Sequence, residues 1–88
     1  MASRIVTICN PLGLHARAAA KFVHLASRYT SRISVARAGR QVDGKSILGV
    51  LLLAAASGST ITIVAEGDDA DVALDELCAL VASGFGEL

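Results

Sequence analysis

The sequence predicts a single α+β domain over residues 1–88, an open-faced β-sandwich in which a four-stranded sheet carries three helices on one face. Strand-like and helix-like segments follow one another in the order β-α-β-β-α-β-α. Each strand-like segment alternates apolar with polar residues, which is typical of a sheet with one covered face. Hydrophobic residues make up 53% of the chain, enough for one core at this length. We therefore expect an antiparallel or mixed sheet with all helices on the same side.

The first strand is predicted from Arg4 to Cys9 by its β-branched residues, and Asn10-Pro11 ends it with a turn. After a short loop, a helical pattern begins at Ala16. Four apolar residues recur at helical spacing and should face the core: Ala19, Phe22, Val23 and Ala26. The other side is basic and should face solvent, with Arg17, Lys21, His24 and Arg28.

A hairpin and a second helix are predicted next. Alternation from Arg32 to Arg37 indicates a strand, and the turn Ala38-Gly39 lets residues 40–42 pair back with it. Ser46 is a good N-cap for an apolar helix beginning at Ile47. The apolar residues of this helix occupy more than one stripe, so we expect some of them to be exposed as a docking surface. The alternative is a helix buried completely in the core.

The last strand and the last helix complete the predicted domain. Residues 57–59, Ser-Gly-Ser, break the second helix, and alternation from Thr60 to Ala65 predicts a strand. Gly67-Asp68-Asp69 should cap the last helix, and Gly84 should stop it. Its apolar face is formed by Ala73, Leu74, Leu77, Leu80 and Val81.

The charges are balanced in number but separated along the chain. All eight basic residues fall between Arg4 and Lys45, and seven of the eight acidic residues lie from Glu66 onward. This asymmetry predicts one basic face for an anionic partner. Nucleic acid is disfavoured as that partner, because the chain has three aromatic residues and no interleaving of basic with aromatic positions.

The two cysteines, Cys9 and Cys78, are far apart and form no metal-binding motif. Both lie in segments predicted to be half buried, so we interpret them as reduced core thiols in a cytoplasmic protein. The longest apolar run, residues 47–56, is too short to span a bilayer, and no signal peptide is recognisable.

The junction from Gly13 to Arg17 is the strongest candidate for a functional site. It places His15 where a strand and loop give way to a helix, whose first N–H groups and dipole favour an anion. The ring of His15 can act as a nucleophile, and the guanidinium of Arg17 can bind phosphoryl oxygens. From local spacing alone, a histidine that merely caps the helix is an equal alternative.

Three motifs together make the chain resemble the family of the histidine-containing phosphocarrier protein (HPr) of the phosphoenolpyruvate-dependent phosphotransferase system. Residues 13–17, Gly-Leu-His-Ala-Arg, are similar to the active-site motif of that family, and residues 45–50, Lys-Ser-Ile-Leu-Gly-Val, to its regulatory-serine motif. Residues 65–68, Ala-Glu-Gly-Asp, resemble the segment that enters its last helix. The first two motifs stand about thirty residues apart, and the resemblance covers nearly the whole chain.

The resemblance implies a phosphoryl carrier, not a stand-alone enzyme, that takes phosphate from enzyme I and passes it to A-type acceptor domains. It implies that His15 carries the phosphate on Nδ1, that Arg17 neutralises it, and that the N–H groups of Ala16 and Arg17 hold its oxygens. We expect no cofactor or metal, and we expect the protein to be a monomer. An HPr kinase/phosphorylase would phosphorylate Ser46, although that residue also serves as a helix cap. The expected docking surface comprises Ala20, Lys21, His24, Lys45, Ile47, Leu48 and Leu51.

One departure from the family pattern and two alternatives remain. The family usually has proline after the arginine, and this chain has Ala18, which should loosen the helix start without removing a reacting group. A nitrogen-related paralogue of the carrier would share the fold and His15 but act as a signal. A small interaction module with a structural His15 would never accept phosphate.

Overall fold

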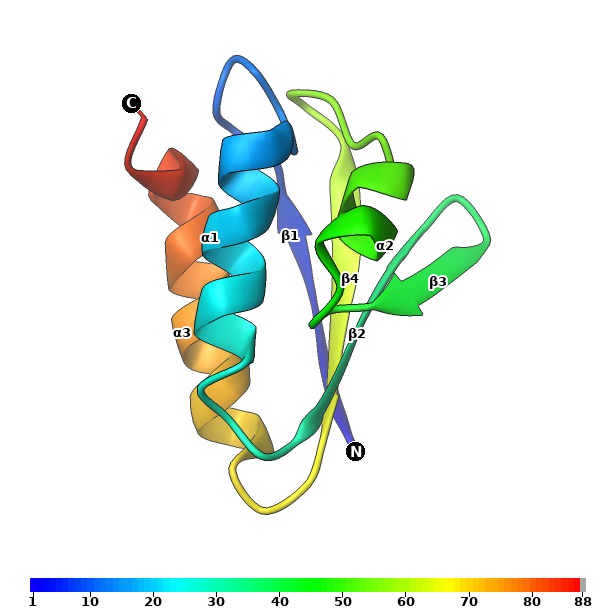
Figure 1. The fold of residues 1–88 in the computed structure, drawn as a ribbon, viewed down its shortest axis with the longest axis vertical. Helices are drawn as coiled ribbons and strands as arrows, with labels where there is room; N and C mark the ends of the chain where they lie inside the picture. The colour runs from blue at the N-terminus through cyan, green and yellow to red at the C-terminus, as the bar shows by residue number, and fades with distance from the viewer. Residues whose placement is uncertain (88) are drawn as a thin grey trace.

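The computed structural model describes residues 1–87, and its elements follow the predicted order (Figure 1). The four strands are β1 (Ala2–Thr7), β2 (Arg32–Arg37), β3 (Arg40–Asp43) and β4 (Thr60–Glu66). The three α-helices are α1 (Ala16–Ala26), α2 (Ile47–Leu52) and α3 (Ala70–Ala82), and a short 3₁₀ turn, η1 (Gly84–Gly86), follows them. The sequence had not predicted η1.

The sheet is antiparallel throughout and has the strand order β1-β4-β2-β3. The last strand in the chain, β4, is central, with Thr60 opposite Thr7 of β1 and Ile63 opposite Val35 of β2. All three helices lie on one side of this sheet (Figure 1), so the predicted open-faced α+β class is confirmed.

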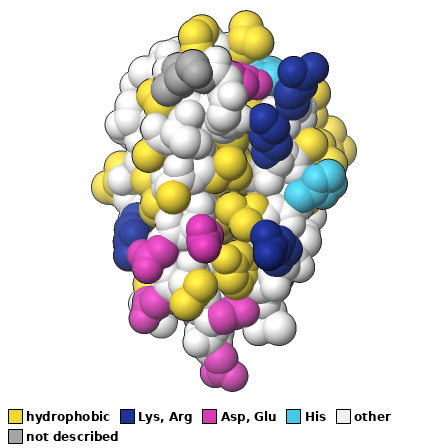
Figure 2. Space-filling view, turned by 90° about the vertical axis from the view of Figure 1, so that its left-hand side faces the viewer, with side chains coloured by type: hydrophobic (Ala, Val, Ile, Leu, Met, Phe, Trp, Pro, Cys, Tyr) yellow, Lys and Arg dark blue, Asp and Glu magenta, His cyan; other side chains and the backbone are white. Residues whose placement is uncertain are grey.

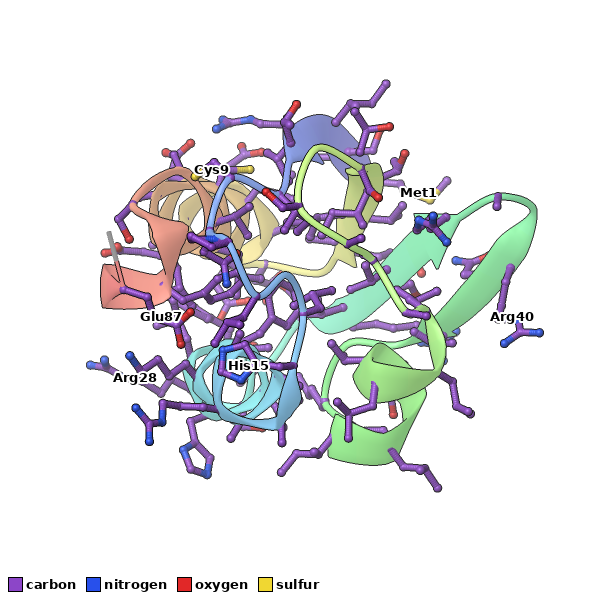
Figure 3. All side chains as sticks on the ribbon, turned by 90° about the horizontal axis from the view of Figure 1, so that it is seen from above. Met1, Cys9, His15, Arg28, Arg40 and Glu87 are labelled. Atoms are coloured by element: carbon purple, nitrogen blue, oxygen red, sulfur yellow. The ribbon has the colours of Figure 1, made fainter. Side chains whose placement is uncertain are left out.

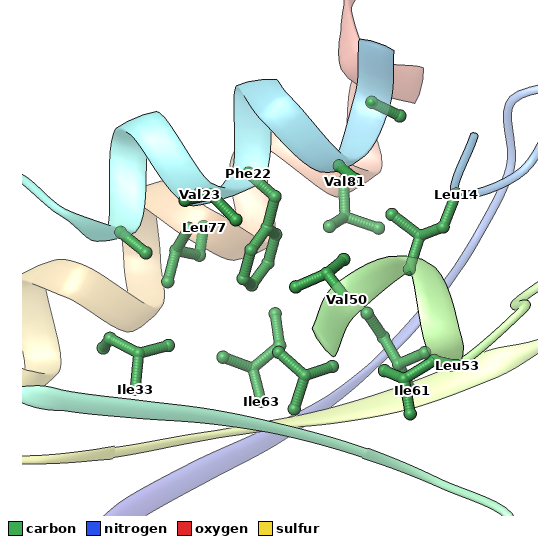
Figure 4. Close-up of a cluster of buried hydrophobic side chains, with 14 of the residues drawn as sticks. Leu14, Phe22, Val23, Ile33, Val50, Leu53, Ile61, Ile63, Leu77 and Val81 are labelled. Atoms are coloured by element: carbon green, nitrogen blue, oxygen red, sulfur yellow. The ribbon is translucent and has the colours of Figure 1, made fainter. Parts of the chain in front are cut away.

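The core lies between the helices and the covered face of the sheet (Figure 4). Phe22 from α1 and Leu77 from α3 point toward Ile63 of β4, and all three are at most 1% exposed. The predicted apolar face of α1 is confirmed, because Ala19, Phe22, Val23 and Ala26 are buried. The basic side chains on its other side are exposed, as expected.

The first strand begins and ends two residues earlier than predicted, and Cys9 is not a core thiol. Pairing of β1 with β4 stops at Thr7, because its partner strand begins at Thr60. The backbone of Ile8 then bonds to the loop that precedes β4: its carbonyl accepts from the N–H of Gly58, and its N–H donates to the carbonyl of Ser59. Beyond this point the chain leaves the sheet, and Cys9 is exposed (Figure 3). Cys78 is half buried, as expected.

The short helix α2 is only partly covered. Its N-cap is Ser46, whose Oγ accepts a hydrogen bond from the N–H of Gly49 at 3.1 Å, as predicted. Val50 is fully buried, whereas Leu48 is 68% and Leu52 55% exposed. The expectation of exposed apolar residues is therefore confirmed, and the alternative of a buried core helix is wrong.

Asp69 precedes α3 but does not cap it with its side chain. Its carboxylate instead accepts hydrogen bonds from the N–H groups of Thr30 and Ser31, each at 2.9 Å, and from the hydroxyls of both residues. These bonds, that of the Ser31 hydroxyl foremost, lower the pKa of Asp69 to about 2. The carboxylate thus ties the loop between α1 and β2 to the start of α3. Within residues 1–87, no helix has the length and apolar character needed to cross a membrane.

Candidate functional site

The loop before α1 is held against a distant segment of the chain, and this contact requires glycine at position 13. Gly13 has φ +66°, a conformation that glycine adopts at little cost. The N–H of the next residue, Leu14, donates to the carbonyl of Ala55 at 2.9 Å. A Cβ on Gly13 would lie only 2.6 Å from that same carbonyl oxygen. The loop is therefore fixed immediately before His15.

His15 is the N-cap of α1, and its ring is held at the helix start. The Nδ1 atom accepts a hydrogen bond from the backbone N–H of Arg17 at 3.3 Å. A backbone N–H can only donate, so Nδ1 carries a lone pair and no proton. The first-turn N–H groups, including that of Ala16, have no acceptor within the helix. Nδ1 therefore lies at the start of α1, where the ring caps the helix and where the sequence also predicts an anion site.

Glu87 contacts the other nitrogen of the same ring, and the sequence analysis missed this residue. Its Oε2 lies 2.7 Å from Nε2 of His15, and its Oε1 accepts from Nδ2 of Asn10 at 2.9 Å. Figure 3 shows the side chains of His15 and Glu87 pointing toward one another. Exposure of the two side chains is 26% and 15%. The hydrogen bond from Asn10, and then those with His15, lower the pKa of the Glu87 carboxyl.

The segment that carries Glu87 is anchored at Phe85, within η1. Phe85 is 1% exposed and packs into the core, with φ +57°. Its carbonyl accepts a hydrogen bond from Nζ of Lys21 at 2.6 Å. The C-terminal segment therefore runs beside the first turns of α1 (Figure 1), which brings Glu87 to His15.

Asn10 joins the loop to Glu87 from a fully buried position. Its Nδ2 donates both to the carbonyl of Gly13 and to Glu87, each at 2.9 Å. The Gly13 carbonyl can only accept, so this contact fixes which end of the Asn10 amide faces the glutamate. The result is a connected group of Asn10, Gly13, His15 and Glu87.

Basic side chains extend from this group along the exposed side of α1: Arg17, Lys21, His24 and Arg28. Figure 2 shows most of its lysine, arginine and histidine side chains on the right-hand side of the view and most of the acidic ones in the lower part. The ion pairs within residues 1–87 join Arg4 to Asp75 and His15 to Glu87. The guanidinium of Arg17 is thus unpaired among the described residues. It lines a surface depression beside the site, together with Leu12 and Glu87.

The other predicted site residues lie outside the group around His15. Ser46 caps α2, and Ile47 and Leu48 follow it on the surface. Ala20 and Leu51 are half-buried, and Nζ of the half-buried Lys45 donates to the carbonyl of Tyr29 at 2.7 Å. The exposed Leu52 was not predicted, although it stands four residues after Leu48 and hence on the same face of α2.

The geometry suits reversible addition of an anionic group to Nδ1. The ring offers a lone pair there, beside backbone donors at a helix end, and the exposed side chain of Arg17 follows two residues later. Among the residues that the structure describes, no three His, Cys, Asp or Glu side chains gather where a metal ion could be held.

The chain is similar in sequence and in fold to known phosphocarrier proteins. The family model described as "PTS HPr component phosphorylation site" matches residues 2–83. The chain is 53% identical to phosphocarrier protein HPr of Cupriavidus necator over 87 residues, covering 99% of this chain and 98% of that protein. It is 49% identical to phosphocarrier protein NPr of Shewanella violacea, covering 96% and 92%. A crystal structure of HPr from Thermoanaerobacter tengcongensis superposes with a TM-score of 0.96 at 41% identity, covering 100% of this chain and 99% of the other.

Proposed function

The chain belongs to the HPr family, the phosphocarrier proteins of the phosphotransferase system, and on that premise we propose that Nδ1 of His15 carries the phosphoryl group. The observation that supports this assignment best is the hydrogen bond that Nδ1 accepts from the N–H of Arg17 at the start of α1. It marks Nδ1 as the unprotonated nitrogen and places it beside the positive end of the helix.

In the proposed cycle, the phosphoryl group comes from enzyme I and leaves to an A-type acceptor domain. The lone pair of Nδ1 attacks phosphorus, and the bond to the donor breaks with its electron pair going to the donor. The phosphoryl oxygens then accept from the N–H groups of Ala16 and Arg17, and the guanidinium of Arg17 offsets their charge. Delivery to the acceptor reverses these steps.

The test is labelling with enzyme I and phosphoenolpyruvate. His15→Ala should abolish labelling, whereas His24→Ala should leave it intact, because His24 lies on the exposed side of α1 away from the helix start. Arg17→Ala should slow transfer and keep the melting temperature. Label that survives on the His15 variant would show that another residue accepts phosphate, and no label on the unmodified protein would favour a structural His15.

We propose that both partners dock on the exposed faces of α1 and α2. Exposed Leu48 and Leu52, with Ile47 at 40% exposure, form an apolar area next to the basic side of α1. Apolar residues beside cations suit a transient complex with an acidic partner surface. The predicted surface of Ala20, Lys21, His24, Lys45, Ile47, Leu48 and Leu51 is kept in this proposal, with Leu52 added.

We propose Ser46 as the regulatory site of an HPr kinase/phosphorylase. The support is its position, where its Oγ caps α2 immediately before the apolar docking area. A phosphate there adds negative charge at a helix N-terminus, which the helix tolerates, but also beside a surface that would receive an acidic partner. The modification should therefore act on docking and leave the fold intact.

We further propose a monomer that serves the sugar branch of the system. The relative named NPr keeps the nitrogen-related alternative open. Pull-down with His15-phosphorylated protein discriminates between the two, because sugar-specific A-type domains are expected in the first case and regulators in the second. Sedimentation at micromolar concentration tests the oligomeric state.

A further inference from the structure

We propose that the hairpin of β2 and β3 belongs to the docking surface, where the guanidinium groups of Arg37 and Arg40 bind carboxylates of the partner. The inference rests on the proposed docking of partners over α1 and α2. It extends that surface past α2, to two residues that lie outside the three motifs of the sequence. A partner that fits this surface carries acidic groups on both sides of its apolar contact.

The hairpin stands on the side of α2 that faces away from α1 (Figure 1), and α2 contacts both α1 and β3. Arg37 and Arg40 are paired directly across the turn at Ala38-Gly39. Figure 3 shows Arg40 on the hairpin side of α2 and His15 on the other side. The apolar area on α2 therefore lies between two groups of cations, those of α1 and those of the hairpin.

Both guanidinium groups are held in place by the end of α2. Nη1 of Arg37 donates to the carbonyl of Leu53, and Nη1 of Arg40 donates to that of Leu52, each at 3.1 Å. A guanidinium has five N–H donors, so each arginine keeps donors for a carboxylate. Because these contacts already restrict two long side chains, a partner that binds them loses less conformational entropy.

The two arginines lack a carboxylate of their own. The ion pairs within residues 1–87 involve other side chains, one between β1 and α3 and the other at His15. The hairpin thus holds two positive charges at successive backbone carbonyls, and no acidic side chain of residues 1–87 pairs with either. Carboxylates brought by another protein would be attracted to this place.

A surface depression joins the arginines to the apolar area of α2. It is lined by Arg37, Ala38, Arg40 and residues 52–54. Leu52, which is 55% exposed, belongs both to this depression and to the apolar area. The hairpin site is therefore continuous with the proposed docking area. An apolar centre with a charged border on either side is the usual composition of a protein interface.

The alternative is that the arginines only cap α2, whose last turn has no basic residue of its own. Cations at the C-terminal end of a helix stabilise it, so this role predicts a lower melting temperature when they are removed. It predicts no effect on association. A charge at the border of an interface instead changes the association rate constant and its dependence on salt. The two roles therefore have different readouts.

The experiment measures the association rate constant of the full chain with fluorescently labelled enzyme I, by stopped-flow mixing. The variants are Arg37→Gln, Arg40→Gln and the two combined. Arg32→Gln is the matched control, because it removes the same charge from an exposed position at the other end of β2. We expect the combined variant to associate roughly threefold to tenfold more slowly at low salt, and each single variant to fall between it and the control. The difference should shrink at high salt, because exposed charges are then screened.

The control should associate at the rate of the unmodified protein, and thermal melting checks that every variant is folded. The inference would be overturned by normal association of the combined variant, by a loss that the control shares, or by a loss that high salt leaves unchanged.

Leu48→Glu separates this inference from the proposed docking over α2. If Leu48→Glu weakens binding and the arginine variants do not, the docking surface ends at α2 and only the present inference fails. If Leu48→Glu binds normally, the proposed docking area itself is wrong.

Discussion

The tight approach of Gly13 to the segment at residue 55 predicts that Gly13→Ala is among the most damaging small substitutions in the domain. Alanine at φ +66° is strained by about 1–2 kcal/mol. Its Cβ would also meet the Ala55 carbonyl at 2.6 Å. Relieving that clash pulls apart the hydrogen bond from Leu14 to Ala55, and a buried donor left unpaired costs about 1–3 kcal/mol. The sum is about 2–5 kcal/mol of unfolding free energy.

Gly39→Ala is the matched control, because Gly39 has φ +81° and nothing within 4 Å of an added Cβ. It should lose only the strain, so Gly13→Ala should melt lower than this control by roughly 5–20 °C, taking about 4–8 °C per kcal/mol for a domain of this size. Thermal unfolding followed by circular dichroism measures the difference. Transfer from enzyme I should slow only in Gly13→Ala, since the loop that moves carries His15. Equal melting temperatures in the two variants would refute the close-approach argument.

Three further predictions concern the charged and apolar groups described above. Ser46→Asp should keep or slightly raise the melting temperature and slow transfer; transfer at the normal rate would reduce Ser46 to a helix cap. Leu48→Glu should weaken binding to enzyme I without unfolding the domain, as titration calorimetry and melting can show together. For Asp69, the folded pKa of about 2 lies below the ordinary 3.8, so its stabilising effect is complete above about pH 4 and disappears as the pH falls through about 2. Melting temperatures from about pH 6 downward should fall more steeply for the unmodified protein than for Asp69→Asn, and parallel curves would contradict this.

The fold could be predicted from local patterns because each element carries its own signal. The spacing of Phe22 and Val23, the cap at Ser46 and the alternation around Ile63 all act within a few residues, and all are confirmed. The predicted end of β1 was wrong, because the strand stops where its partner β4 begins. Cys9 was misplaced for the same reason, since alternation was extended past the last paired residue.

The residues of the candidate site also fall into two groups: those with a local sequence signal and those whose partners are distant in the chain. The position of His15 and Arg17 at a helix start could be predicted from sequence, because that signal is local. Glu87 could not, because it is 72 residues from His15 and reaches it only through the burial of Phe85. Asp69 shows the same limitation, since its partners Thr30 and Ser31 lie almost forty residues earlier. Polar contacts between distant segments produce no periodic pattern of residues, so they cannot be predicted from the sequence in this way.

The central position of β4 also determines when, during folding, the proposed phosphate site can form. β1 has no strand neighbour other than β4, and the loop before His15 is held by Ala55 and Ser59. These contacts join segments about fifty residues apart. Bringing such segments together costs loop-closure entropy before the contacts can stabilise the fold, which slows folding. On the ribosome, His15 emerges early, but the contacts around its ring are complete only when residue 87 follows. We therefore expect an incompletely folded chain to be a poor phosphoryl acceptor.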